Sequence, residues 1–129
     1  MYTIERVTKM SDELLQGIAK LTAQISPDEE APTADKISNI VNNKNAVLLI
    51  AREDASQAIV GMATTIALPT VHGTQAHLED LVVEKGFRHQ GLGERLTTAQ
   101  MQEAEKMGAD RMVFTSSSSR TEAHSLYKD

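Results

Sequence analysis

The sequence predicts an α+β domain built on one mixed β-sheet, with its elements in the order β-α-α-β-β-β-α-β-α. Short segments of alternating or continuous apolar residues predict strands, and segments with apolar residues at helical spacing predict helices. The early strands are expected to pair antiparallel. Residues 77–115 are different, because their strand-helix-strand order favours a right-handed crossover between two parallel neighbours.

Residues 2–7 alternate between polar and apolar and predict the first strand, and Ser11 follows where a helix N-cap is expected. The helix after it is predicted to end near Ser26 and Pro27. Its apolar stripe consists of Leu14, Ile18, Leu21 and Ile25, with Leu15 beside them. Residues 27–32 predict an acidic, proline-bounded loop, after which Thr33 can cap a second, short helix. One side of that helix carries Ile37, Ile40 and Val41.

Residues 46–51 and 58–68 are apolar runs separated by a polar turn, which predicts a hairpin. Residues 69–74 predict a loop, and residues 77–83 predict the next strand. A helical pattern then runs from Leu92 to Met107 and ends at Gly108, a natural residue for the position after a helix. The apolar face of this helix is predicted to consist of Leu92, Leu96, Ala99 and Met107. Residues 111–115 predict a short strand, and Thr121 can cap a last helix that runs through Tyr127.

The composition restricts the class of function. The 129 residues are 40% hydrophobic and 24% charged, as expected of one folded domain spanning residues 1–129. A net charge of −5 disfavours a nucleic-acid partner, because phosphate binding needs clustered Lys and Arg, and it fits a cationic substrate slightly better. The lack of cysteine excludes disulfides, thiolate zinc sites and cysteine nucleophiles, and His72 and His124 lack ligand spacing, so we expect no metal. No segment predicts a signal peptide or a membrane span, so we expect no membrane partner and a cytoplasmic location.

The segment Arg88-His89-Gln90-Gly91-Leu92-Gly93 lies between the end of a predicted strand and the start of a predicted helix. Glycines at such a turn let the backbone approach a ligand closely, and the free N–H groups of the first helical turn can bind pyrophosphate oxygens. Arg88 and Arg95 add positive charge at the same end. The pattern lacks the Gly-Lys of a Walker A loop and the third glycine of a dinucleotide-binding loop. The sequence therefore predicts an anion site, the alternative being that the two glycines only form a tight turn.

The segment resembles the GNAT superfamily of acetyl-coenzyme A-dependent N-acetyltransferases, whose motif is Arg or Gln, two residues, Gly, one residue, and Gly or Ala. Arg88, Gly91 and Gly93 match it. Residues 78–83 are similar to the bulged strand of this family, and residues 120–127 are similar to its closing helix, which presents a tyrosine near the cofactor sulfur. The resemblance implies the GNAT-type (acyl-CoA N-acyltransferase) fold and an enzyme that moves an acetyl group from acetyl-CoA to a primary amine by direct attack within a ternary complex.

The resemblance also assigns a cofactor site at the end of the strand and the start of the helix. Its residues are Leu81, Val82, Val83, Arg88, His89, Gln90, Gly91, Leu92, Gly93 and Glu94. A backbone N–H of Leu81 or Val83 would polarise the acetyl carbonyl. Tyr127 is the candidate general acid for the departing thiolate, the alternative being a tyrosine with its hydroxyl at the surface.

Glu79 is the leading candidate for the general base, acting through water. Strand alternation puts His77, Glu79 and Leu81 on one face, with Asp80 on the other unless the bulge redirects it. Glu79 and Asp80 are also the candidates for binding a cationic substrate, and both could instead be ordinary solvated strand residues. His77 is the second candidate base, and a third alternative is that the amine loses its proton to water.

The acceptor stays open between a small amine, an amino sugar and a protein N-terminus, although residues 78–80 and 88–93 are also similar to glucosamine 6-phosphate N-acetyltransferases. The family continues beyond its tyrosine into one or two further strands, whereas this chain ends at Asp129. We therefore expect either a domain shortened at its C-terminal end and lacking the last strands, or a homodimer in which a second subunit supplies one wall of the acceptor site. The alternative functions are a non-catalytic GNAT-like coenzyme-binding or interaction module, and an enzyme that uses another nucleotide at the same turn.

Overall fold

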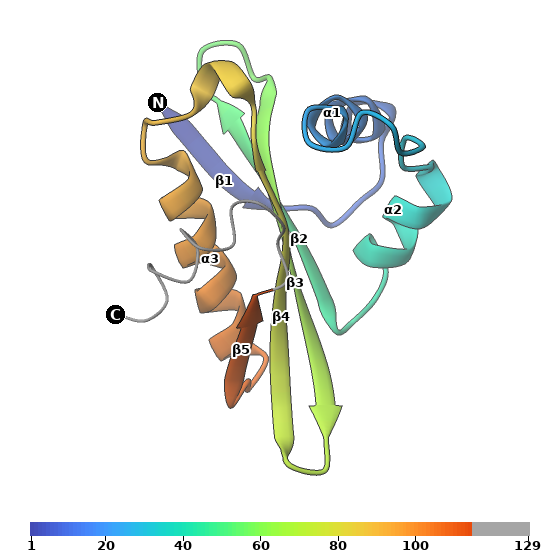
Figure 1. Cartoon of the computed structure of the whole chain (residues 1–129), viewed down its shortest axis with the longest axis vertical. Coiled ribbons are helices and arrows are strands. Elements are labelled where there is room, and N and C mark those ends of the chain that lie inside the picture. The colour runs from blue at the N-terminus through green and yellow to red at the C-terminus, as the bar shows by residue number, and fades with distance from the viewer. Residues whose placement is uncertain (115–129) are drawn as a thin grey trace.

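The structure, a computed structural model, describes residues 1–114. Within this range, five strands form one sheet and three α-helices cover its two faces (Figure 1). In chain order the elements are β1 (Tyr2–Arg6), α1 (Asp12–Ala23), α2 (Ala34–Val41), β2 (Ala46–Glu53), β3 (Ile59–Thr70), β4 (Gly73–Val83), the 3₁₀ turn η1 (Lys85–Phe87), α3 (Leu92–Lys106) and β5 (Arg111–Phe114). This order confirms the prediction as far as the fifth strand. The predicted last helix, with Thr121, His124 and Tyr127, lies outside the described residues.

The strand order in the sheet is β1-β2-β3-β4-β5. The pairs from β1 to β4 are antiparallel, and β4 pairs with β5 in parallel. Helix α3 connects these two parallel strands, so the predicted mixed sheet and its crossover are confirmed. None of the described helices is long and apolar enough to cross a membrane.

Helices α1 and α2 lie on one face of the sheet and α3 lies on the other (Figure 1). Alternate residues of the central strands serve the two cores, which explains why β2 is a continuous apolar run. The α1 and α2 face buries Leu14, Ile18, Leu21 and Ile37 against Leu48, Ile50, Met62 and Val82. The α3 face buries Leu92 and Leu96 against Val47, Leu49, Ala51, Val60 and Ala63.

Local signals set the starts of the first two helices. The Ser11 hydroxyl accepts a hydrogen bond from the Leu14 N–H at 3.1 Å, and the Thr33 hydroxyl accepts one from the Lys36 N–H at 3.2 Å. Both predicted N-caps are therefore confirmed. The predicted end of the first helix was wrong: α1 ends at Ala23, and Ile25 lies beyond it with 50% of its surface exposed. The Gln24 N–H bonds back to the Leu21 and Thr22 carbonyls, so the chain turns away before the apolar stripe can continue.

The predicted loop over residues 69–74 was also wrong, because β3 and β4 form a long hairpin whose turn is only Val71 and His72. The Thr70 hydroxyl accepts the His72 N–H and donates to the Gly73 carbonyl, which closes the turn. Pro69 is tolerated in a strand because the pairing of β3 with β2 ends at Ile66, so its missing N–H removes no bond to β2.

The predicted apolar face of helix α3 is confirmed in part: Leu92 and Leu96 are buried, and Ala99 and Met107 pack partly buried against the same core, but polar residues share the buried side. The buried residues are Leu92, Leu96, Thr97, Gln100 and Ala104, whereas Ala99 is only half-buried and Met107 is the C-cap. Positions 92, 96, 100 and 104 are four residues apart and lie along one side of a helix, so Gln100 is carried into the core. The predicted helix end is confirmed: Gly108 has a φ of +78°, and the Ala109 N–H bonds to the Ala104 carbonyl at 3.1 Å.

Candidate active site

Strand β4 contains the bulge that the family resemblance implied. Met62 of β3 pairs with Val82, but Thr64 pairs with Glu79, so Asp80 and Leu81 together oppose the single residue Ala63. Asp80 takes up the extra length in a left-handed conformation, with a φ of 56°. Few residues other than glycine adopt this conformation, and aspartate is one of those that do so more readily.

The bulge changes which side chains share a face. Asp80 lines a cavity formed with α1 and α2, whereas Leu81 packs into the core under α3. The prediction that Leu81 shares a face with His77 and Glu79 was therefore wrong, because one extra residue reverses the alternation of the strand. His77 and Glu79 alternate with Leu78, which packs on the α3 side, so both lie on the face of the sheet that Asp80 occupies.

A buried glutamine of α3 holds the two strands together beside the bulge. Gln100 is 1% exposed, and its Nε2 donates to the Thr64 carbonyl at 2.8 Å and to the Glu79 carbonyl at 3.2 Å. These carbonyls belong to the residue pair that precedes the register shift. Gln100 was not among the predicted site residues. The signal for it is a polar side chain four residues after Leu96 on the buried side of a helix.

Among the described residues, the edge of β4 that pairs with β5 has no strand partner at the bulge. Pairing between β4 and β5 runs from Gln75 with Arg111 to Leu78 with Phe114 and goes no further in the part of the chain that the structure describes. Within that part, no strand covers residues 79–83 on this side. The predicted backbone site at Leu81, Val82 and Val83 therefore lies on a part of β4 that pairs only with β3 among residues 1–114.

The N-terminus of α3 lies just beyond this edge. Gly91 is its N-cap residue, with a φ of 80°, and no side chain of the described residues caps the helix. The N–H groups of the first turn, from Leu92 to Glu94, therefore stay available for a ligand. A Cβ on Gly91 would meet no atom within 4 Å, so the conformation and not the space requires glycine here. A Cβ on Gly93 would lie 3.9 Å from the Val83 side chain, which places this helical turn beside the end of β4.

Hydrogen bonds tie the glycine segment and the helix turn after it to the end of β4 and to β1. Arg88 Nε donates to the Val83 carbonyl at 3.0 Å, and Gln90 Oε1 accepts from the Tyr2 hydroxyl. The Arg95 guanidinium donates to the Tyr2 carbonyl at 3.2 Å. His89 is exposed in a left-handed conformation with a φ of 65°. Strand β1 thus anchors the segment, a contact that local sequence patterns do not encode.

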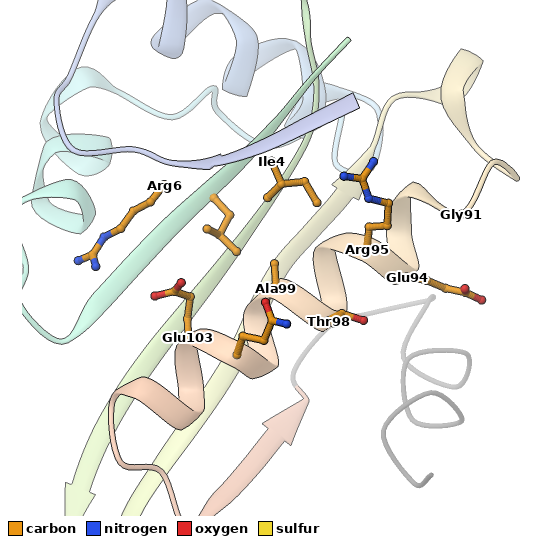
Figure 2. Close-up of a pocket in the computed structure, with 10 residues that line it drawn as sticks. Ile4, Arg6, Gly91, Glu94, Arg95, Thr98, Ala99 and Glu103 are labelled. Carbon is orange, nitrogen blue, oxygen red and sulfur yellow. The ribbon is translucent and has the colours of Figure 1, made fainter. Parts of the chain in front are cut away.

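Two hollows adjoin these elements. A groove of about 530 Å³ runs between β1 and α3, with Gly91 and Arg95 toward one end and Arg6 and Glu103 toward the other (Figure 2). A smaller cavity of about 150 Å³ lies between α1, α2 and the sheet and includes Asp80. No group of three or more His, Asp or Glu residues within 1–114 could hold a metal ion. Tyr127, the predicted general acid, lies outside the described residues.

The family model described as "Acetyltransferase (GNAT) family" matches residues 13–129. The chain belongs to this family. Its GNAT-type fold, a mixed sheet with helices on both faces, confirms the predicted fold class. No protein of curated function matches the chain.

Solved structures of other acetyltransferases share the fold. The glucosamine-6-phosphate N-acetyltransferase of Arabidopsis thaliana superimposes with a TM-score of 0.81 at 19% identity, covering 98% of this chain and 90% of that one. An aminoglycoside acetyltransferase from an uncultured soil metagenomic sample, solved with sisomicin, gives a TM-score of 0.77 at 20% identity, with 98% and 85% covered. A predicted acetyltransferase with acetyl-CoA from Clostridium acetobutylicum gives 0.79 at 18% identity, with 100% and 90% covered. At these identities the likeness shows the fold alone.

Proposed function

We propose that this GNAT domain is an N-acetyltransferase that moves the acetyl group of acetyl-coenzyme A to a primary amine by direct attack within a ternary complex. The observation that carries the proposal is a juxtaposition: the uncapped N-terminus of α3 lies beside the bulge of β4, whose outer edge is unpaired within the described chain. The first element suits an anion and the second suits an extended amide chain. A coenzyme with both a pyrophosphate and a pantetheine arm matches this pair.

The residues present fit the pyrophosphate. Three backbone N–H groups, those of Leu92, Gly93 and Glu94, have no side-chain cap within residues 1–114. The positive end of the helix dipole adds to their attraction for a negative charge. Neither Gly91 nor Gly93 places a side chain over this turn, and Arg88 and Arg95 lie beside it. When bound, acetyl-CoA would supply an acetyl group already activated as a thioester.

The edge of β4 would hold the pantetheine arm. Within Leu81 to Val83, the backbone N–H groups that point away from β3 can pair with its amide carbonyls as a neighbouring strand would. The bulge also changes the direction of the backbone at Asp80 and Leu81, and a single N–H aimed at the acetyl oxygen would polarise it. Gln100 supports this function as a positioning residue, because its amide bridges β3 and β4 immediately before the bulge.

The reaction also requires the amine to lose a proton and the sulfur to gain one. Glu79 is our leading candidate for accepting the first proton through water, and Asp80 would attract the cationic form of the amine. His77 is the second candidate, since its Nε2 is buried and has no hydrogen-bond partner among residues 1–114. Tyr127 is the candidate donor to the sulfur, in line with the family resemblance.

The test is acetyl transfer itself. Purified protein is incubated with acetyl-CoA and a panel of primary amines, and both the free thiol and the acetylated amine are measured by absorbance and mass spectrometry. We expect equal amounts of the two products, and we expect Gly91→Trp to abolish both. Release of thiol without an acetylated amine would contradict amine transfer. Tight coenzyme binding without any product would favour the alternative of a non-catalytic coenzyme-binding module.

A further inference from the structure

The cavity of about 150 Å³ between α1, α2 and the sheet has mainly apolar walls. Its apolar lining residues are Ile18, Pro32, Ile37, Ile40, Leu48 and Met62. An engineered protein cavity of about 150 Å³ with similar walls binds benzene, so this one suits a body of about six to eight non-hydrogen atoms. Hydroxyl groups of a sugar would lose their hydrogen bonds to water against such walls without regaining them.

Two oxygen-bearing groups from neighbouring strands enter the same cavity. Thr64 is 1% exposed, and its hydroxyl has no hydrogen-bond partner within the described range. Buried polar groups are rarely left in this state, so a ligand nitrogen that reached the Thr64 hydroxyl would satisfy it. The Asp80 carboxylate lines the cavity from the bulge of β4, and no ion pair or hydrogen bond within residues 1–114 occupies it. An ammonium or amine nitrogen matches these two oxygens.

A single cation also lines the cavity. Lys36 of α2 is exposed, and its ammonium group forms no ion pair with any described residue. A ligand with one amine can direct it toward Asp80 and keep its apolar body between the helices. A ligand with a second ammonium group would place like charge near Lys36 and bind less well.

We infer that the acceptor of this domain is a primary amine with a compact apolar body and no second positive charge, held with its nitrogen at Asp80 and Thr64. This inference rests on the proposed acetyl transfer and names its substrate class. It separates this chain from transferases that act on amino sugars, polyamines or aminoglycosides, whose bodies are rich in hydroxyl or amino groups.

The first experiment compares hexylamine with 1,6-diaminohexane, which share a carbon chain and differ by one ammonium group. Benzylamine and glucosamine 6-phosphate extend the comparison to a ring and to a sugar. We expect a kcat/KM at least about tenfold higher for hexylamine and benzylamine than for the other two, the size of effect that one unfavourable charge or several unpaired polar groups produce. Lys36→Glu should reduce the preference for hexylamine over the diamine about tenfold. Lys44→Glu makes the same charge change outside the cavity lining and should leave the preference unchanged.

The second experiment measures binding without catalysis, by ligand-detected NMR of hexylamine in the presence of coenzyme A. Asp80→Asn removes the charge with a residue that also tolerates the left-handed conformation, and it should weaken hexylamine binding about tenfold. Thr64→Val removes only the buried hydroxyl and should weaken hexylamine binding severalfold while the free energy of unfolding stays the same or rises. Coenzyme binding by calorimetry should be unchanged in both variants.

The two experiments separate the inference from the proposed function. Efficient transfer to glucosamine 6-phosphate or to the diamine, with little transfer to hexylamine, would overturn the inference and leave the acetyltransferase intact. Absence of transfer to every amine would overturn the proposed function, and the NMR measurement would then decide only whether the cavity binds an apolar amine. The inference would be overturned if hexylamine did not bind, or if it bound to Asp80→Asn and Thr64→Val as well as to the native protein.

Discussion

Gln100→Leu removes the amide that bridges β3 and β4 beside the bulge and keeps a side chain of similar size. In the native protein, Gln100 Nε2 donates two hydrogen bonds, one of 2.8 Å to the fully buried Thr64 carbonyl and one of 3.2 Å to the partly buried Glu79 carbonyl. Leaving a buried acceptor unpaired costs about 1–3 kcal/mol, and the more exposed carbonyl costs less. Burying the apolar leucine regains about 1 kcal/mol. We therefore expect the free energy of unfolding to fall by about 1–3 kcal/mol.

Urea unfolding followed by circular dichroism measures this loss, with an unchanged m-value showing that only stability has changed. Gln102→Leu is the matched control, because Gln102 lies on the exposed side of the same helix and should change stability by less than about 0.5 kcal/mol. Acetyl-CoA binding should weaken in Gln100→Leu and not in Gln102→Leu. If Gln100→Leu were as stable as the native protein, the bridge would not hold the strands at the bulge and the reasoning would be refuted.

Three further predictions concern other parts of the fold. In Gly61→Ala the new Cβ would lie 2.9 Å from Leu96 Cδ1 of α3, so we expect a loss of about 1–3 kcal/mol on urea unfolding, and no loss would show that α3 can shift freely. Gly91→Ala imposes a side chain on a φ of 80°, and we expect a cost of about 1–2 kcal/mol in stability with weaker acetyl-CoA binding; an unchanged protein would contradict the left-handed cap. The Arg52 guanidinium hydrogen-bonds Glu13 at 2.9 Å and lowers the pKa of Glu13 below its ordinary value of 4.5. A group whose pKa is lower in the folded state stabilises the fold at a pH above its unfolded pKa, and this stabilisation is lost as the pH falls through its folded pKa. The melting temperature of the native protein should therefore exceed that of Glu13→Gln at pH 7, and the two temperatures should converge as the pH falls below about 4.5. A difference that does not depend on pH would exclude this ion pair.

Local patterns predicted much of this fold because the signals lie within a few residues of each other. Ser11 and Thr33 cap helices through bonds that span three residues, and the apolar spacing after each cap is short-range. The errors fall at a helix end that the apolar spacing does not mark and at a pairing between strands. Ile25 continues the spacing of α1, but the chain turns before it, and the pairing of residues 69–74 continues because β3 and β4 extend beyond the end of β2.

The candidate site was only partly predictable for the same reason. The glycine segment and the bulged strand are contiguous in sequence, so their residues could be named in advance. The side of the sheet that Leu81 faces depends on its register with β3, and a shift of one residue reverses it. The bridge from Gln100 and the contact of Tyr2 with Gln90 join elements far apart in the chain, so only the folded structure brings them together.

Calorimetric titration of acetyl-CoA into the native protein, Gly91→Trp and Gly108→Trp tests the central claim most directly. Both glycines have a positive φ and open space around the missing side chain, but they lie at opposite ends of α3. We expect saturable binding with one site per chain for the native protein and Gly108→Trp. We expect no binding by Gly91→Trp, although circular dichroism should show that this variant is folded. Equal binding by both variants, or no binding by the native protein, would contradict a coenzyme site at the N-terminus of α3.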